Sequence, residues 1–579
     1  MHKSEIAHVL RMIAGLLTLK GEPVFRVRAY ERAARTVEHG DFDLEALARE
    51  GKLIEIPGIG KNLASKIHEL VTTGTSAYLQ ELSKEVPIGL LDVVNVPGIG
   101  LSTARLLYET LGVSDLKTLE HAVEARLIQT VPGLGPKREA IIRRGLSEVM
   151  KHWDRVLLAQ ALPVAEHILG LFAKAGVPGA IVGETRRALE TVASLDILLE
   201  AESNAGLLEK FKTIGLGYFN SQDLWDSAWN GETQAFVLPS NLGVPMKVWV
   251  VPQDRFGWKQ LHLTGPSSFL GWIQQLAESQ GYDVGKDGLT KEGTPVPAAG
   301  ETHIFEMLGI SFIPPELRHM SECWQMARDN RTVEPVKLSD IKGDLHVHSN
   351  WSDGLNSIEQ MVQKALDLGY SYIAITDHAT RIKVINGLDP DKIQAQIQEI
   401  QMVSQKYPQI RILSGVEVDI LKDGSLALPD DILAKLDIVV ASIHQGLDGA
   451  GRSIVDRLVK AAANPHVDII GHPTGRLIGR RPGNQTDLDE LFKVAAANNT
   501  LLEINASPER LDLSGELAAA ARGFGVRFAV STDAHSTNGM HDMALGIAAS
   551  ARRGGLTSES VVNAQDLEDW FPLKGRSGD

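Results

Sequence analysis

Hydrophobic and polar residues follow two different patterns along the 579-residue chain. In the first third, apolar residues recur at helical spacing, beginning with the amphipathic segment 1–22. From about 152 to 320 the pattern is mixed, and from 343 on, strand-like apolar runs alternate regularly with helical segments. Strands in the mixed region are predicted at 179–183, 192–199, 234–238 and 246–251. The patterns therefore predict a multidomain protein of α and α/β class.

These changes in pattern, together with a proline- and charge-rich stretch at 327–344, place the domain boundaries. The regular alternation after 343 favours a parallel, barrel-like fold. We expect a helical domain (1–80), a second helical region (81–150), an α+β domain (151–258), a smaller domain (259–325), a linker (326–342) and a C-terminal βα domain (343–579).

A short motif occurs three times in the helical region, as EIPGIGKNLASKI (55–67), NVPGIGLSTARLL (95–107) and TVPGLGPKREAII (130–142). Each copy has a Pro-Gly-aliphatic-Gly turn before a helix, whose first N–H groups have no partner within the helix and can bind phosphate. Such contacts read the DNA backbone and not the bases. The copies resemble helix-hairpin-helix motifs, and we expect sequence-independent DNA binding by Gly58, Gly60, Lys61, Gly98, Gly100, Gly133 and Gly135.

The C-terminal domain has nine potential metal ligands at predicted strand ends or in the loops that follow. The carboxyl ends of barrel strands converge on one rim, so these side chains are expected to meet. Nine nitrogen and oxygen ligands suit two or three divalent cations, with Mn²⁺ favoured and Zn²⁺ or Fe²⁺ as alternatives. The predicted ligands are His346, His348, Asp353, His378, Glu417, His444, His472, Asp533 and His535.

A cluster of this kind favours phosphoester hydrolysis, because divalent cations activate water and neutralise charge on a phosphoryl group. Arg476, four residues after His472, is a candidate phosphate clamp. The motifs HVHSNWSDG, ITDH, GVE, SIH, GHPTGR, LEINASPERLDL and STDAHS resemble the PHP (polymerase and histidinol phosphatase) domain, most closely that of bacterial family X DNA polymerases. The resemblance implies a distorted (βα)7 barrel, a trinuclear metal centre and 3′-5′ exonuclease activity.

Residues 183–199, GETRRALETVASLDILL, resemble the palm motif of the same family, including Arg187 and Asp196. The resemblance implies 8-kDa-like, fingers-like, nucleotidyltransferase-like palm and thumb-like regions in the order of the first four predicted domains. Ser194 and Lys247 stand where the family has metal-binding carboxylates, and Glu184 stands where it has a serine that contacts the triphosphate. Because two-metal nucleotidyl transfer requires those carboxylates, we expect polymerase activity to be lost.

Composition excludes several other classes of protein. The single cysteine, Cys323, excludes an intramolecular disulfide framework and a cysteine-rich zinc site. The chain has no run of 18 uncharged apolar residues, so no membrane span is predicted. A net charge of −15 argues against a broad basic surface, although backbone contacts with DNA remain compatible with it. We expect a cytoplasmic monomer that binds DNA and not membranes.

Three hypotheses about function follow from these patterns. The first is a DNA-binding, metal-dependent 3′-5′ exonuclease or 3′-end phosphoesterase that acts in DNA repair. The second is an active gap-filling polymerase, which would have to capture metal despite Ser194 and Lys247. The third is a DNA-binding scaffold whose barrel hydrolyses a small phosphate monoester. The repeated glycine turns favour the first hypothesis over the third.

Overall fold

The computed structural model describes residues 2–40, 42–151, 153–201, 234–238, 240–285, 288–379, 387–447, 451–484 and 487–572. The chain divides into two compact units, one comprising 1–312 with 479–481 and the other 313–478 with 482–579. Within the described residues, no helix is both long and apolar enough to cross a lipid bilayer.

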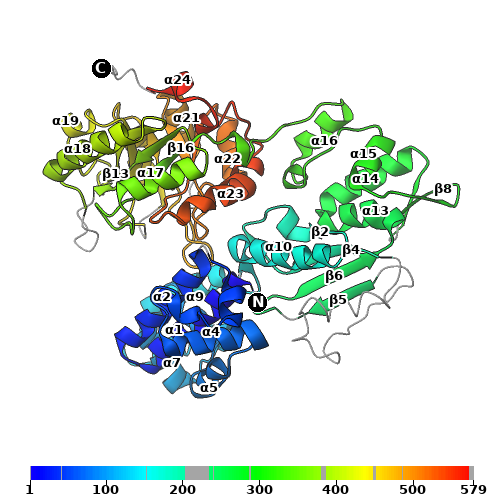
Figure 1. Cartoon of the computed structure of the whole chain (residues 1–579), viewed down its shortest axis with the longest axis horizontal. Helices are drawn as coiled ribbons and strands as arrows, with labels where there is room; N and C mark the ends of the chain where they lie inside the picture. Colours follow the sequence, from blue (N-terminus) through cyan, green and yellow to red (C-terminus); the bar gives the residue numbers. More distant parts are fainter. Residues whose placement is uncertain are drawn as a thin grey trace. The chain divides into compact units, whose positions relative to one another are not determined.

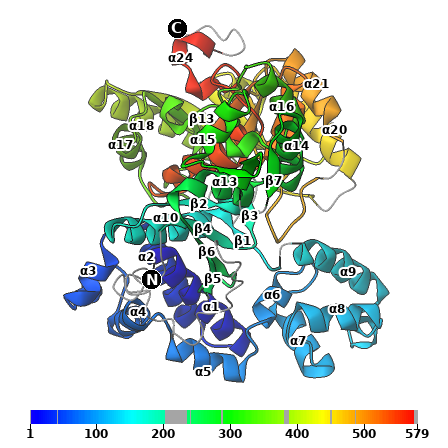
Figure 2. The same cartoon turned by 90° about the vertical axis from the view of Figure 1, so that its right-hand side faces the viewer.

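The first unit begins with an all-helical region built around one apolar core. Helix α1 (Lys3–Lys20) packs against α2, α4, α5, α6 and α7, and Figure 2 shows it in the middle of these helices. Gly21 ends α1 in the left-handed conformation, at φ 83°. The other elements are α2 (Val24–His39), α3 (Leu44–Arg49), η1 (Leu53–Glu55), α4 (Lys61–Thr73), α5 (Ala77–Glu85), α6 (Leu90–Val94), α7 (Leu101–Leu111), α8 (Leu116–Glu124), η2 (Ile128–Thr130) and α9 (Pro136–Met150).

A four-stranded mixed sheet follows, in the strand order β2-β4-β6-β5. Its strands are β2 (Gly179–Val182), β4 (Leu195–Glu200), β5 (Gln234–Leu238) and β6 (Met246–Val251), at the positions expected from the sequence. Strand β4 runs parallel to β6 and antiparallel to β2. Helices α10 (Leu158–Lys174) and α13 (Gln253–Thr264) lie beside the sheet (Figure 1). The short elements β1 (Val156–Leu157), α11 (Gly183–Arg186) and β3 (Thr191–Val192) belong to the same region.

The end of this unit is a small α+β region. It comprises α14 (Ser267–Ser279), the antiparallel strands β7 (Asp283–Gly285), β8 (Gly288–Lys291) and β9 (Thr294–Val296), and α15 (Glu301–Met307).

The second unit is a parallel barrel of seven strands in the order β10-β11-β13-β14-β15-β16-β17. A parallel bridge between Val347 and Ala534 joins the first strand to the segment after the last one and closes the ring. The short strand β12 pairs with β13 outside the main path. The strands are β10 (Gly343–Val347), β11 (Tyr372–Ile375), β12 (His378–Ala379), β13 (Arg411–Asp419), β14 (Ile438–Ser442), β15 (Ile469–Ile470), β16 (Leu501–Asn505) and β17 (Phe528–Ser531). The predicted (βα)7 barrel is confirmed.

Helices surround these strands, as α17, α18, α21 and α22 show around β13 and β16 in Figure 1. The elements are η3 (Pro315–Leu317), α16 (Ser321–Arg328), η4 (Leu338–Asp340), α17 (Ile358–Asp367), α18 (Pro390–Lys406), α19 (Asp430–Leu433), α20 (Gly451–Ala462), α21 (Asp489–Ala497), α22 (Gly515–Arg522), η5 (Gly539–Asp542), α23 (Met543–Gly546), the π-helical turn η6 (Ile547–Arg552), η7 (Val562–Ala564) and α24 (Leu567–Trp570).

The segment expected as a linker, 326–342, belongs to the barrel unit instead of separating it from the preceding one. Val336 is fully buried in the core between strands and helices, and its N–H donates to the carbonyl of Leu556. Nη1 of Arg552 also donates to the carbonyl of Val336 at 3.4 Å. Proline and charged residues suggested a free linker, but the buried side chains of Val336 and Ile341 and these hydrogen bonds attach the segment to the barrel.

Two apolar layers build the barrel. Side chains from all seven strands form an inner cluster, for example Leu413 on β13, Val440 on β14 and Ala529 on β17. The residues that alternate with them, such as Ile412 and Val439, pack against the helices in a larger outer cluster. Because side chains on a strand change face at every residue, the inner face of each strand continues at every second position towards its carboxyl end.

Candidate metal centre

The inner faces of β13 and β14 carry predicted ligands directly beyond the inner apolar cluster. On β13 the inward series Leu413, Gly415 and Glu417 leads from the apolar cluster to a ligand, and Val440 on β14 leads in the same way through Ser442 to His444. The structure brings all nine predicted ligands to this end of the barrel, where eight are buried or partly buried and Asp353 is exposed. Alternation along the strands thus positions the site.

Glu417 lies at the centre of the site and is almost completely buried. Its Oε1 atom lies 3.2 Å from Nε2 of His444 and 3.1 Å from Nε2 of His472. Its Oε2 atom lies 2.7 Å from Nδ1 of His378 and 3.6 Å from Nε2 of His346. One carboxylate therefore faces at least four imidazoles, which is an arrangement suited to bridging cations.

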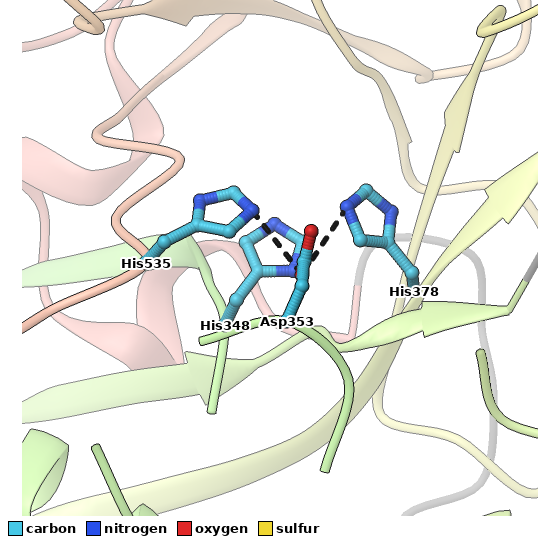
Figure 3. Close-up of side chains that lie close together, drawn as sticks. All are labelled: His348, Asp353, His378 and His535. Atoms are coloured by element: carbon cyan, nitrogen blue, oxygen red, sulfur yellow. Dashed lines mark ion pairs between the residues drawn. The ribbon is translucent and has the colours of Figure 1, made fainter. Parts of the chain in front are cut away.

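Asp353 and Asp533 complete the site on its other side. Asp353 lies between two histidines, with its Oδ1 atom 3.7 Å from Nε2 of His378 and 3.4 Å from Nε2 of His535 (Figure 3). Asp533 lies 3.1 Å from Nε2 of His348. Within the described residues, three overlapping groups have ligand atoms close enough to share an ion: His348, Asp353, His378 and His535; His346, His348 and Asp533; and His378, Glu417 and His444.

Unsatisfied buried atoms support a metal function for this cluster. A buried polar atom without a hydrogen bond is costly, and it requires an explanation where it occurs. Nδ1 of His378 and Oε2 of Glu417 are only 2.7 Å apart, yet their geometry makes no hydrogen bond. Five buried ligand atoms have no hydrogen-bond partner among the described residues: His346 Nε2, His348 Nδ1, His378 Nδ1, Glu417 Oε2 and His472 Nδ1. These donor atoms fit divalent cations.

Two further carboxylates, which the sequence analysis did not single out, orient the histidines. Nδ1 of His346 lies 2.7 Å from Glu503, and Nδ1 of His444 lies 2.7 Å from Asp419. A carboxylate that accepts the Nδ1 proton leaves Nε2 free to bind a cation. The signal was present in the sequence, because Asp419 stands two residues after Glu417 on the same strand face.

Charge within the cluster favours cation binding. Burial opposes ionisation of Glu417, but the surrounding histidines, first His444 and His378, hold its pKa well below the ordinary value. Burial and the neighbouring imidazoles of His535 and His378 lower the pKa of His348 to about 3. Burial opposes protonation of His444, yet Glu417 and Asp419 raise its pKa to about 10. At pH 7 Glu417 is thus ionised and His348 neutral, as metal ligands must be, whereas His444 is protonated and must lose its proton when a cation binds.

The guanidinium group of Arg476 contacts backbone carbonyls. Its Nε donates to the carbonyl oxygen of Arg510 at 2.7 Å, and its Nη2 donates to that of Leu511. The role of Arg476 as a phosphate clamp therefore stays a prediction. Arg510, which the sequence analysis did not single out, is closer to the ligands, with its Nε 3.8 Å from Oδ2 of Asp533.

The three glycine turns have the same backbone geometry. Gly58, Gly98 and Gly133 adopt φ values of 82°, 94° and 84°, which a side chain would disfavour. Gly60 and Gly100 cap α4 and α7 without a side-chain hydrogen bond, so the first N–H groups of both helices stay available. A Cβ atom built on either residue, or on Gly133 or Gly135, meets nothing within 4 Å. Lys61 is exposed next to the first turn.

The palm-like sheet carries its own charge pairs. Oγ of Ser194 donates to Oδ2 of Asp196 at 2.6 Å, and Asp196 is the cross-strand neighbour of Lys247. Glu184 accepts from Arg155 at 2.7 Å and from the N–H of Ala193 at 2.9 Å. Polar groups of the protein thus form hydrogen bonds with both Glu184 and Ser194. In the family motif that Glu184 and Ser194 resemble, these two positions contact the triphosphate and a metal ion, respectively.

Two arginines of this region also form contacts within the protein. Arg186 forms a bidentate pair with the buried carboxylate of Glu301 at 2.7 and 3.1 Å, and Arg187 donates to the carbonyl of Thr264. These contacts tie the region around α11 to α13 and α15.

Helix-hairpin-helix turns, a palm-like sheet and a histidine-rich parallel barrel in one chain define the class of a DNA-processing protein. Family models match residues 1–76 (helix-hairpin-helix domain), 90–148 (SAM-like helix-hairpin-helix tandem), 259–319 (DNA polymerase beta thumb) and 344–507 (PHP domain). The chain is 36% identical over 575 residues to the "DNA polymerase/3′-5′ exonuclease PolX" of Bacillus subtilis, covering 98% of each chain.

The chain therefore belongs to the PolX family of DNA polymerases with a C-terminal PHP domain. Its barrel alone is similar to smaller proteins. A probable phosphatase of Thermoanaerobacter is 30% identical over 234 residues, which are 38% of this chain and 89% of that protein. A probable phosphatase of Caldanaerobacter subterraneus is 30% identical over 203 residues, or 33% and 75% of the two chains.

Proposed function

We propose that the barrel is a metal-dependent phosphoesterase that removes nucleotides from the 3′ end of DNA, and that the palm no longer polymerises. The observation that carries the proposal is the contrast between the two sites. The barrel brings together nine potential ligands, whereas the palm pairs its one remaining carboxylate, Asp196, with Ser194. The relative in Bacillus subtilis is named for both activities, so the proposal keeps one of them for this chain.

Some barrel residues would hold cations, and others orient the residues that hold them. His346, His348, Asp353, His378, Glu417, His444, His472, Asp533 and His535 would hold two or three divalent ions, of which we propose Mn²⁺ as the native one. Divalent ions bound there supply a means to activate water at neutral pH and to neutralise charge on the phosphoryl group.

Glu503 and Asp419 fix the imidazoles of His346 and His444, so that each Nε2 points to the centre of the site. Burial of these groups keeps bulk water from weakening their electrostatic interactions with the substrate.

The helix-hairpin-helix turns indicate which class of substrate the protein binds. Their repeated turns present helix N-termini and Lys61 to a phosphate backbone, which a protein acting only on a small monoester would not need. This favours a DNA end as the substrate, even though the barrel shares its similarity with probable phosphatases.

A single gapped duplex tests both parts of the proposal. With Mn²⁺, the purified chain should shorten the labelled 3′ end, and with nucleotides added it should not extend it. His346→Ala should abolish shortening, whereas His466→Ala, in the turn before β15 at the other end of the barrel, should retain it. Shortening by His346→Ala at the wild-type rate would refute the nuclease assignment. Template-dependent extension would refute the loss of polymerase activity.

A further inference from the structure

We propose that Arg510 binds the phosphate of the substrate and that Arg476 positions it. The inference rests on the proposed phosphoesterase function of the barrel and identifies a residue of that site. The loop that follows β16 runs past the predicted metal ligands and carries both a cation, Arg510, and a strained backbone at Leu511.

Arg510 is a cation at the edge of the ligand cluster. Its side chain is 20% exposed, and its Nε atom lies 3.8 Å from Oδ2 of Asp533, whose Oδ1 faces His348 at 3.1 Å. Oδ2 of Asp533 also accepts a hydrogen bond from Asn505 at 3.1 Å. The aspartate therefore has a neutral donor of its own and does not depend on Arg510 for its orientation.

The two terminal nitrogens of Arg510 make no hydrogen bond with any described residue of the chain. A guanidinium group presents a planar fork of donors that matches two oxygens of a phosphate group. Cations held by Asp533 and His348 would lie on one side of such a phosphate, and the free nitrogens of Arg510 would lie on another. The geometry therefore suits a group that bears negative charge and has several oxygens.

Arg476 holds the backbone from which Arg510 projects. It donates to the carbonyls of Arg510 and Leu511, and Leu511 has φ 44°, a conformation that a bulky side chain rarely adopts. Asp512 accepts from the N–H groups of Thr474 and Gly475 at 3.0 and 2.9 Å and ties the same two loops together. Strain of this kind persists only where neighbouring contacts impose it, and it is frequent at functional sites.

Orthophosphate binding to the Mn²⁺-loaded full chain, measured by calorimetry, tests the assignment without relying on turnover. Arg510→Gln should weaken phosphate binding at least about tenfold, which is the loss expected for a charge-assisted hydrogen bond. The phosphate affinity of Arg510→Lys should lie between those of the wild type and Arg510→Gln. Bound Mn²⁺ per chain should not change. Arg411→Gln, an exposed arginine at the start of β13 and at the other end of the barrel, is the matched control.

Turnover of two substrates adds a second readout. With a 3′-labelled single strand and with 4-nitrophenyl phosphate, Arg510→Gln should raise KM more than it lowers kcat. An effect on both substrates assigns Arg510 to the phosphate itself, whereas an effect on DNA alone would assign it to another part of the strand and overturn the proposal.

Stability separates the two arginines. Arg476→Gln should lower the melting temperature and weaken phosphate binding, while Arg510→Gln should leave the melting temperature unchanged. Wild-type phosphate affinity in Arg510→Gln would overturn the proposal, and so would a loss of bound Mn²⁺ in proportion to the loss of affinity. If the wild-type chain hydrolyses neither substrate, the proposed function fails, whereas the calorimetric comparison still decides whether Arg510 binds phosphate.

Discussion

Replacing Glu503 by glutamine should weaken metal binding without changing the shape of the site. Glu503 is fully buried and accepts three hydrogen bonds. Its Oε1 accepts from Nδ1 of His346 at 2.7 Å, and its Oε2 accepts from the N–H of His472 at 2.6 Å and from Asn505 at 3.1 Å. All three partners are donors, so both oxygens of the carboxylate must act as acceptors.

A glutamine side chain has one acceptor oxygen and one donor nitrogen. If its oxygen faces His346, its NH₂ group meets the N–H of His472 and the amide of Asn505. If the side chain is reversed, Nδ1 of His346 loses its acceptor. Either arrangement leaves a buried donor unsatisfied, at a cost of about 1–3 kcal/mol. We therefore expect the affinity for Mn²⁺ to fall by about 10- to 100-fold, the range typical of a residue that orients a metal-binding histidine.

The measurement is a titration of metal-free protein with Mn²⁺, followed by calorimetry and by the metal content of the recovered chain. Glu490→Gln is the control, because Glu490 is exposed on α21 and forms an ion pair with the exposed Arg452, a contact of little energetic weight. An unchanged affinity in Glu503→Gln would show that Glu503 does not orient His346 towards a cation, and the role given to this carboxylate would then be wrong.

Three further predictions concern stability and pH. Gly98→Ala should destabilise the helical domain by about 1–3 kcal/mol, because φ is 94° and the new Cβ would lie 2.8 Å from Ile141. Gly60→Ala is the control and should melt like the wild type, because φ is −81° and a Cβ atom there meets open space. Equal melting temperatures of the two variants would contradict this account. Removing metal with a chelator should lower the melting temperature of the barrel, and Mn²⁺ should restore it. At a Mn²⁺ concentration of one hundred times Kd, binding should add about 2.7 kcal/mol to the free energy of unfolding. An unchanged melting curve would argue against a metal centre. Neighbouring carboxylates outweigh burial and raise the pKa of His444 to about 10 and that of His535 to about 9, so both are protonated at pH 6 to 8 before metal binds. Each proton must leave as a cation enters, so Mn²⁺ affinity should rise with pH by up to about tenfold per pH unit for each proton released, and a pH-independent Kd would refute the assignment.

The ligand cluster could be predicted from the sequence because its members share one visible property. Each follows or ends an apolar strand, as His444 follows ASI and Asp533 follows VST. Parallel strands bring their carboxyl ends to one rim, so order along the chain was enough to predict proximity in space. The barrel and its closure followed from the same regular alternation.

Residues that act through a neighbour were harder to find. Glu503 lies in the middle of LLEIN, where its charge looks like an isolated polar residue in a buried strand. Its partner, His346, is 157 positions away, and only the register of the barrel shows that the two meet. The sequence analysis singled out Arg476 alone, and Arg510 was found only because the structure shows the guanidinium group of Arg476 bonded to backbone carbonyls.

The extent of the barrel unit was also beyond the sequence. The composition of 326–342 is that of an exposed connection, and the burial of Val336 and Ile341 shows that the segment packs on the barrel. Composition averages over many residues, whereas attachment can depend on a few of them.

The charge pairs of the palm-like sheet have a consequence for the history of the chain. Glu184 holds Arg155, and Lys247 stands beside Asp196 on the adjacent strand. Changing Glu184 back to serine alone would leave Arg155 without its carboxylate, and changing Lys247 to aspartate alone would set two acids side by side with no cation between them. Each of these single substitutions is therefore expected to cost stability. If the palm no longer polymerises, as proposed above, regaining nucleotidyl transfer would require several substitutions at once, and selection acting on one substitution at a time would keep the sheet as a scaffold.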